Sequence, residues 1–202
     1  LPIKKGLSSS AAICVLVARA FNRLYDLKMN IRDEMEMAYL GETATPSRCG
    51  RMDQGCAYGN RSIMMIFDGA HMDVIELKVP KDLFFVIVDL GASKNTQEIL
   101  SSLNQAYPFA ANEVQENVQK YLGSISAKIT QEVASALQQG DAFKIGELMK
   151  VAQREFDKHL IPACRSQLTA SVLHELLNYQ PIQPYILGGK GVGSQGDGTA
   201  QF

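Results

Sequence analysis

Residues 2–12, with the sequence PIKKGLSSSAA, join a glycine and three consecutive serines to the start of an apolar stretch. The apolar residues continue to Tyr25 at helical spacing, so we expect a buried helix whose first turn lies at the serines. The free N–H groups of that turn and its positive dipole end would stabilise an anion, best a phosphate. Serine hydroxyls can also ligate Mg²⁺. A plain serine cap on the helix would account for the same residues.

A carboxylate falls on the apolar face of the next expected helix. Asn30 can cap this helix, and Met35 and Ala38 would share one of its faces. Glu42 follows Met35 by seven residues and therefore lies on the same face. A carboxylate in such a place needs a cation or hydrogen-bond donors.

A second carboxylate lies in the segment that follows. Residues 43–60 are broken by Pro, Gly, Ser and Arg and are predicted to form a loop, which carries Asp53. Two carboxylates in separate environments can divide labour, one holding a metal and the other handling a proton. Alternatively, Arg48 and Arg51 could pair with the two acids as ordinary surface salt bridges.

A glycine-rich segment, GGKGVGSQGDG, occupies residues 188–198. Gly191, Gly193 and Gly196 match GxGxxG, but a dinucleotide fingerprint needs a following helix, and residues 199–202 are typical of a strand. A Walker A motif is excluded because Gly191 occupies its Ser/Thr position. The remaining interpretation is a glycine loop whose backbone can approach a bulky anion closely.

The rest of the chain predicts an α+β fold. Residues 80–82, Pro-Lys-Asp, are the candidate boundary between two domains. The expected elements are a hairpin of strands 63–67 and 74–79, a buried strand 84–89, helices 96–103, 113–139, 141–159 and 166–179, and strands at 185–187 and 199–202.

The composition limits the classes of function. The chain has 202 residues, 46% apolar and 20% charged, which excludes a disordered chain. Its net charge of -1 implies no nucleic acid and no anionic membrane as partner, and no apolar run is long enough to span a membrane. The four cysteines form no CxxC pair, so we expect them reduced in a cytoplasmic protein. His71, His159 and His174 have no metal-ligand spacing.

Both ends of the sequence lead us to expect an internal piece of a longer protein. It begins on Leu1 and enters the glycine-serine segment within five residues, and it stops at Phe202 where a strand begins.

The three segments together resemble the GHMP small-molecule kinases, the superfamily of galactokinase, homoserine kinase, mevalonate kinase and phosphomevalonate kinase. Residues 2–12 are similar to its phosphate-binding motif, and residues 191–196 resemble its late glycine-rich motif. Residues 50–54, GRMDQ, are similar to the G-x-M-D-Q of galactokinase, so sugar kinases are the nearest in motif. The resemblance implies a ribosomal protein S5 domain 2-like part, residues 1–80, packed on a ferredoxin-like part, residues 81–202, both truncated.

The resemblance also implies an activity and its residues. The chain would transfer the γ-phosphoryl group of ATP, with Mg²⁺, to a hydroxyl of a sugar or sugar derivative. Asp53 would be the general base, and Ser10 and Glu42 would hold the metal. The residues implied to bind the nucleotide are Lys5, Gly6, Leu7, Ser8, Ser9, Ser10, Ala11, Gly191 and Gly193.

Other outcomes stay open at this point. A mevalonate-type acceptor, a non-catalytic nucleotide- or sugar-binding regulator and an inert piece are the alternatives, and a homodimer is left open. Two features depart from the family. Its first motif would lie upstream of Leu1, and Asp197 adds a negative charge to a loop expected to approach phosphates.

Overall fold

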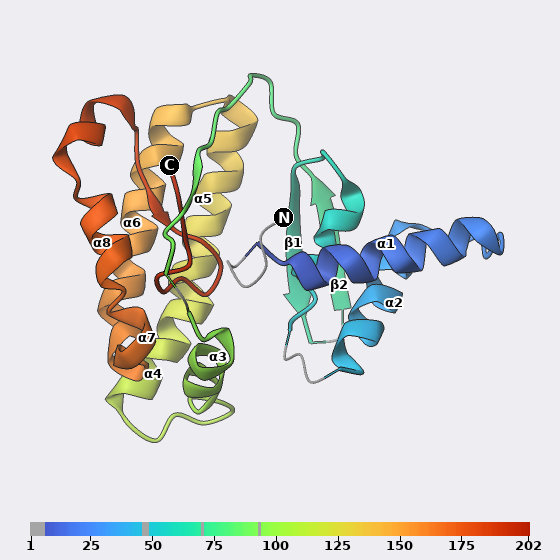
Figure 1. Cartoon of the computed structure of the whole chain (residues 1–202), viewed down its shortest axis with the longest axis horizontal. Helices are drawn as coiled ribbons and strands as arrows, with labels where there is room; N and C mark the ends of the chain where they lie inside the picture. The colour runs from blue at the N-terminus through green and yellow to red at the C-terminus, as the bar shows by residue number, and fades with distance from the viewer. Residues whose placement is uncertain (1–6, 46–48, 70, 93) are drawn as a thin grey trace. The chain divides into compact units, whose positions relative to one another are not determined.

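The computed structural model describes residues 7–45, 49–69, 71–92 and 94–202. These residues fall into two compact units, one with Ser8–Leu77 and the other with Lys78–Phe202, and each is described by itself (Figure 1). Helices and strands occur in both units, so the predicted α+β class is confirmed. The assignment of residues 1–80 and 81–202 to two named domains stays a prediction. Within the described ranges, no helix has the length and apolarity to cross a membrane.

The first unit packs two helices and a short 3-10 helix beside a hairpin. Its elements are α1 (Ser9–Leu24), α2 (Ile31–Thr43), η1 (Asp53–Tyr58), β1 (Ile63–Asp68) and β2 (His71–Glu76). The Asn30 side chain accepts hydrogen bonds from the amides of Arg32 and Asp33, so it caps α2 as predicted. Val15, Met35, Ala38 and Ala57 form the buried core.

Helix α1 is less buried than its apolar sequence predicted. Ala11 and Val15 are buried, whereas Val17, Phe21 and Tyr25 are 51%, 53% and 62% exposed. Among the described residues, α2 and η1 contact α1 on one side. Apolar residues occupy more than one face of α1, so helical periodicity did not identify the face that packs. The prediction of a buried helix is therefore wrong for most of its length.

The predicted loop 43–60 contains the 3-10 helix η1. Gln54, Gly55 and Ala57 are buried there, and a Cβ atom on Gly55 would lie 2.9 Å from the Cε atom of Met65. A helix this short has no repeating apolar pattern, so hydrophobic periodicity does not predict it.

The predicted hairpin is present with different bounds. β1 and β2 pair antiparallel from Ile63 opposite Glu76 to Asp68 opposite His71. The second strand begins at His71 rather than Val74 because the ladder continues to the turn after Asp68.

The second unit contains a three-stranded antiparallel sheet in the order β3-β5-β4, with helices around it (Figure 1). The strands are β3 (Ile87–Asp89), β4 (Lys190–Gly191) and β5 (Thr199–Gln201). The helices are α3 (Thr96–Asn104), α4 (Glu113–Lys120), η2 (Tyr121–Ile125), α5 (Ser126–Gln139), α6 (Ala142–Leu160), η3 (Ile161–Ala163), α7 (Arg165–Leu168), α8 (Ser171–Leu177) and η4 (Gln180–Tyr185).

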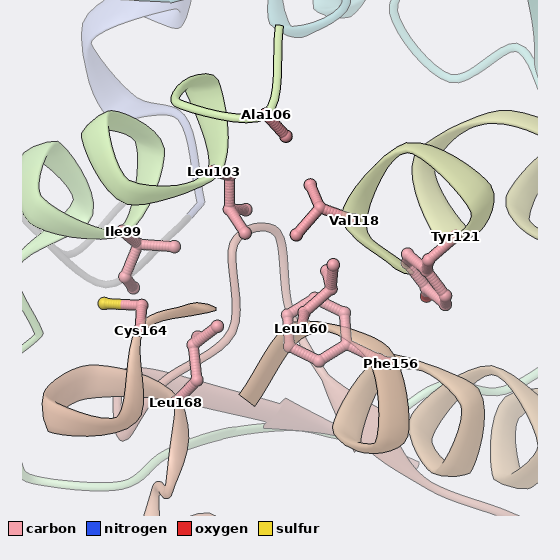
Figure 2. Close-up of a cluster of buried hydrophobic side chains, with 9 residues drawn as sticks. All are labelled: Ile99, Leu103, Ala106, Val118, Tyr121, Phe156, Leu160, Cys164 and Leu168. Atoms are coloured by element: carbon pink, nitrogen blue, oxygen red, sulfur yellow. The ribbon is translucent and has the colours of Figure 1, made fainter. Parts of the chain in front are cut away.

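The largest buried cluster of this unit joins side chains from several helices (Figure 2). The rings of Tyr121 and Phe156 meet edge to face with centroids 5.6 Å apart, a favourable aromatic arrangement. The other members are Ile99, Leu103, Ala106, Val118, Leu160, Cys164 and Leu168. This core anchors α6, the helix that carries the polar side chains beneath the glycine-rich segment.

Three predictions in this unit need correction. The strand expected at 84–89 is shorter and largely exposed: β3 is Ile87–Asp89, it pairs with β5 along one edge, and Phe84 is 90% exposed. The helix expected at 166–179 is split into α7 and α8 at Ala170, whose φ of 42° breaks the helix. No strand forms at 185–187, since residues up to Tyr185 belong to η4.

The long helix expected at 113–139 contains a π-helical turn, η2, between α4 and α5. The predicted boundary between helices 113–139 and 141–159 is confirmed: Gly140, in the left-handed region, ends α5, and the Asp141 carboxylate caps α6 by accepting a hydrogen bond from the backbone amide of Lys144.

Candidate functional site

Three elements of the first unit place polar side chains around one buried carboxylate. Glu42, near the end of α2, is 3% exposed. Its Oε1 accepts a hydrogen bond from the Ser10 hydroxyl of α1 at 2.6 Å, and its Oε2 accepts one from the Gln54 amide of η1 at 2.9 Å. The two donors satisfy the carboxylate as its burial requires. Ser10 itself is exposed, so the cluster opens to solvent on that side.

The start of α1 has the features of an anion site. Ser8 precedes the helix in the left-handed region, with φ 51°, and its side chain makes no capping hydrogen bond. The first turn carries no acidic residue. The positive end of the helix dipole is therefore not neutralised by a carboxylate of its own first turn. Ser8 therefore does not act as a side-chain cap of α1, which was the alternative interpretation of these serines.

Asp53 begins η1 and is half-buried. The adjacent Gln54 contacts Glu42, so the fold brings Asp53 into the neighbourhood of the Ser10–Glu42 pair. Among the described residues, no hydrogen bond or ion pair involves the Asp53 carboxylate. It is therefore available to a ligand that enters the site.

The arginine alternative does not hold for Arg51. This side chain pairs with Glu36 at 3.0 Å and lies over the Tyr39 ring, 4.7 Å from its centroid, and so bonds to neither Glu42 nor Asp53. Arg48, Lys5 and Gly6 lie outside the described residues.

The thiols near the site are held in the neutral form. Burial and then the Glu42 charge raise the pKa of Cys14 and of Cys49, and burial and then the Asp53 charge raise the pKa of Cys56. These cysteines are free. They add no charge to the cluster near neutral pH.

Gln54 is the residue that sequence reasoning missed. It is 0% exposed, and its Oε1 is a buried oxygen without a hydrogen-bond partner among the described groups. The one feature of the sequence that could have identified Gln54 was its place beside Met52 and Asp53 in the GRMDQ stretch, where Asp53 was selected because it is ionisable.

The oxygens present fit Mg²⁺ better than a softer metal. The Ser10 hydroxyl and the Glu42 carboxylate are the kind of oxygen ligands that Mg²⁺ prefers, and their hydrogen bond of 2.6 Å keeps them adjacent. The Gln54 side chain reaches this carboxylate through its nitrogen, which donates to Glu42 Oε2. No group of three His, Cys, Asp or Glu residues in the described part could hold a metal. A magnesium ion here would therefore need further oxygens from phosphates or water.

The glycine-rich segment is tightly packed within the second unit. A Cβ atom on Gly188 would overlap the backbone of Gly146 in α6, so both glycines permit this close approach. Lys190 donates to the Gly191 carbonyl at 2.7 Å, and burial lowers the pKa of that lysine. The strand β5 follows the segment, which excludes the dinucleotide fingerprint as predicted.

Asp197 is committed to a structural contact. Its Oδ1 accepts a hydrogen bond from the backbone amide of Leu173 at 2.8 Å, in the first turn of α8. The carboxylate thus stabilises the positive end of that helix. Asp197, which departs from the glycine-rich motif of the family, therefore has a local structural role. The approach of Gly191 and Gly193 to residues 6–11 stays a prediction.

Comparison with known proteins agrees with these features. Residues 1–60 match the family model described as the GHMP kinases N terminal domain. The chain is 32% identical over 94 residues to a galactokinase of Actinobacillus succinogenes, covering 44% of this chain and 24% of that protein. It is 30% identical over 133 residues to a galactokinase of Thermococcus kodakarensis, covering 63% and 35%. The predicted resemblance to the GHMP kinases is confirmed.

Solved structures show the same fold. The crystal structure of Lactococcus lactis galactokinase complexed with galactose superposes with a TM-score of 0.77 at 16% identity, over 100% of this chain and 58% of that one. The structure of L. major mevalonate kinase in complex with R-mevalonate gives 0.67 at 21% identity, over 96% and 56%. The chain therefore has a GHMP kinase fold. It spans between 24% and 35% of the curated galactokinases that it matches.

Proposed function

We propose that the chain is the phosphate-binding and catalytic part of an ATP-dependent kinase that phosphorylates a hydroxyl of a sugar or sugar derivative. The observation that carries the proposal is the cluster of Ser10, Glu42 and Gln54, which three separate elements bring together at the uncapped start of α1. Phosphoryl transfer asks the protein mainly for positioning and for neutralisation of oxygen charge. An uncapped helix start beside a carboxylate with a hydroxyl supports both tasks.

The nucleotide would lie along residues 5–11, with its phosphates near the first turn of α1. Ser10 and Glu42 would hold Mg²⁺, which supplies positive charge to the phosphate oxygens when it is bound. Ser10 is suited to this role because its hydroxyl is exposed on one side and bonded to Glu42 on the other. Gly191 and Gly193 would approach the nucleotide from the glycine-rich segment.

Asp53 would act as the general base at the acceptor hydroxyl. A base must lie within hydrogen-bond reach of the proton that it takes, and a positioned base contributes roughly 10² to 10⁴ in rate. Asp53 is half-buried and has no described partner that would compete for its carboxylate. The proton of the acceptor hydroxyl would pass to this carboxylate while the hydroxyl oxygen bonds to the γ-phosphorus, and the bond from the γ-phosphorus to the β,γ-bridging oxygen would break so that ADP leaves with that oxygen.

A sugar is the preferred acceptor because the two relatives named above are galactokinases and residues 50–54 have the sequence GRMDQ. A mevalonate-type acceptor is the second candidate, favoured by the likeness to mevalonate kinase. A binding regulator without turnover would have little use for Asp53 beside an acceptor. A cytoplasmic location and a homodimer are part of the proposal that rests on the family alone.

The proposal is tested by ATP consumption with Mg²⁺ in the full-length natural protein, using a panel of sugars and mevalonate as acceptors. We expect ADP release that depends on one sugar of the panel. Release with mevalonate alone would move the protein to the second candidate. Binding of ATP with no ADP release from any acceptor would favour the regulator.

A further inference from the structure

One glutamine of α6 holds the glycine-rich segment from the inside of the second unit. Gln153 is 6% exposed. Its Oε1 accepts a hydrogen bond from the backbone amide of Gly191 at 2.8 Å. Its Nε2 donates to Gln195 Oε1 at 2.7 Å and to Asp157 Oδ1 at 2.8 Å. Both polar ends of the side-chain amide are therefore engaged, two of these contacts with the glycine-rich segment.

The segment has a backbone that needs this support. Gln195 lies in the left-handed region, with φ 61°, and is only 2% exposed. A side chain with a Cβ atom is costly in that region unless its surroundings hold it there. The backbone amide of Gln195 donates to the Val192 carbonyl at 3.1 Å and closes the turn. The side-chain oxygen of Gln195 accepts a hydrogen bond from Gln153. The contact with Gln153 therefore stabilises the strained residue of the turn.

An ion pair orients Gln153. Asp157 follows it by one turn of α6, and its second oxygen, Oδ2, pairs with His174 Nε2 of α8 at 3.0 Å. The helices α6 and α8 lie side by side in the second unit (Figure 1). With Asp157 fixed in this way, a flipped Gln153 amide would set its oxygen against the oxygens of Asp157 and Gln195. Only the observed orientation presents an acceptor to Gly191.

His174 has acceptors at both ring nitrogens. Its Nδ1 lies 2.8 Å from the Ala170 carbonyl and 3.0 Å from the Thr169 carbonyl, while Nε2 faces Asp157. Both nitrogens carry a proton when they donate to all of these groups at once, so the set of acceptors favours the imidazolium form of the ring. Burial alone would lower the pKa of His174, but the hydrogen bonds to Asp157 and the two carbonyls outweigh it and raise the pKa.

The other ionisable groups near this pair do not replace His174. Asp157 from α6 is the acid that faces the ring, while Asp197 of the glycine-rich segment is bonded to the amide of Leu173. Glu175 is the next residue along α8. Burial and then the Asp157 charge raise the pKa of Tyr121 to about 12, so this phenol stays neutral.

We propose that Gln153, oriented by the Asp157–His174 ion pair, is the positioning residue that holds the glycine-rich segment in its observed conformation, and that deprotonation of His174 loosens the segment. The inference concerns the backbone of residues 190–196 and does not need a nucleotide. It bears on the proposed kinase because Gly191 and Gly193 belong to this segment.

The sign of the pH dependence follows from the raised pKa. The stabilisation is fully present below the ordinary histidine pKa of about 6.5 and is lost as pH rises through the higher value of the folded state. The segment should therefore be best protected in mildly acid solution and should open as the pH rises above neutral.

The test is amide hydrogen exchange of the chain, followed by mass spectrometry between pH 6 and pH 9 and corrected for intrinsic exchange rates. We expect protection of peptides covering residues 188–198 to fall by roughly threefold or more across this range, a typical coupling between residues in contact. In His174→Gln, which keeps a donor towards Asp157 but cannot titrate, the dependence on pH should be weaker than in the parent chain, while any contribution from Lys190, whose pKa burial lowers, is common to both. His71→Gln is the matched control, because His71 belongs to an exposed pair with Asp73 in the first unit.

A second variant tests the glutamine directly. Gln153→Met keeps the size of the side chain and removes all three hydrogen bonds, so residues 188–198 should lose protection at every pH while α5 keeps its own. A flat profile in the parent chain, an unchanged slope in His174→Gln, or full protection of the segment in Gln153→Met would each overturn the inference. Should Gln153→Met also lose protection in α5, the slope of His174→Gln decides.

The outcome is separable from that of the proposed function. Titration of the parent chain with Mg·ATP reports on nucleotide binding, whereas the exchange profile is measured without nucleotide. If the exchange profile of residues 188–198 is as expected but the chain does not bind ATP, the positioning role of Gln153 is kept and the kinase proposal is rejected.

Discussion

Replacing Glu42 by glutamine separates the role of its charge from the role of its shape. Among the contacts that the structure describes, the carboxylate accepts hydrogen bonds from Ser10 at 2.6 Å and from Gln54 at 2.9 Å. A glutamine at this position can still accept from Gln54 with its oxygen and donate to the Ser10 hydroxyl with its nitrogen. The variant therefore keeps two hydrogen bonds but loses the charge that strengthens them.

The magnitude follows from the difference between charged and neutral hydrogen bonds. A hydrogen bond to a charged group contributes about 1.5–3 kcal/mol and a neutral one about 0.5–1.5 kcal/mol, so the two bonds together should lose about 2 kcal/mol. For a chain of this size that corresponds to a fall in Tm of roughly 4–8 °C. The variant should fold, because the loss is small against a typical stability of about 5–15 kcal/mol.

The effect on metal dependence should be larger than the effect on folding. With one ligand charge removed, we expect the Mg²⁺ concentration that half-saturates ATP binding to rise by at least about tenfold. Isothermal titration at a series of Mg²⁺ concentrations measures it, with thermal melting as the test of folding. Glu76→Gln is the matched control, because Glu76 forms an exposed ion pair with Arg61 at 2.8 Å and should change neither quantity appreciably. An unchanged Mg²⁺ titration in Glu42→Gln would refute the metal-binding role.

Three further predictions follow from other contacts. Asp53→Asn should fold and bind ATP, but turnover in the full-length protein should fall by roughly 10² to 10⁴; undiminished turnover takes Asp53 out of the mechanism. Burial alone would raise the pKa of Glu34, but its hydrogen bonds and the charge of Arg19, 2.7 Å away, lower this pKa. The Arg19–Glu34 pair therefore stabilises the fold above the ordinary glutamate pKa of about 4.3, and this contribution is lost as the pH falls through the lower pKa of the folded state. Urea unfolding of Glu34→Gln between pH 6 and pH 3 should show a weaker dependence on pH than the parent; equal slopes contradict the assignment. Gly188→Ala should lower stability by about 1–3 kcal/mol or more because its Cβ overlaps backbone, whereas Gly41→Ala, with open space around it, should not; equal melting temperatures would show that the close packing is not needed.

The local signals of the sequence were read correctly where a single turn decides the structure. Asn30 was expected to cap a helix, and further helices were expected to begin near residues 96 and 141; Asn30, Asn95 and Asp141 each accept a hydrogen bond from a backbone amide two or three residues later. Such a contact depends only on residues adjacent in the chain, so its geometry follows from the sequence. The end of α5 at Gly140 is equally local, because glycine adopts the left-handed conformation that ends a helix more easily than other residues do.

Burial was read less well because it depends on distant elements. The apolar residues of α1 and those at 84–87 were expected inside, yet Phe21 and Phe84 are 53% and 90% exposed. Hydrophobic spacing shows that a segment can pack, but not which face meets a neighbour. The break at Ala170 was likewise invisible, because an alanine fits a helix locally and its φ of 42° is imposed by the packing around it.

The sequence by itself determined the family resemblance, the α+β class and the acids that would carry the chemistry, since these follow from residue types at set spacings. Only the tertiary structure decided that Ser10 donates to Glu42 across 32 positions, that the neighbouring Gln54 is the second donor, and that Gln153 links His174 to the glycine-rich segment. Hydrogen bonds between side chains form where folded elements meet, and that meeting is set by the packing of whole helices rather than by any motif within one of them.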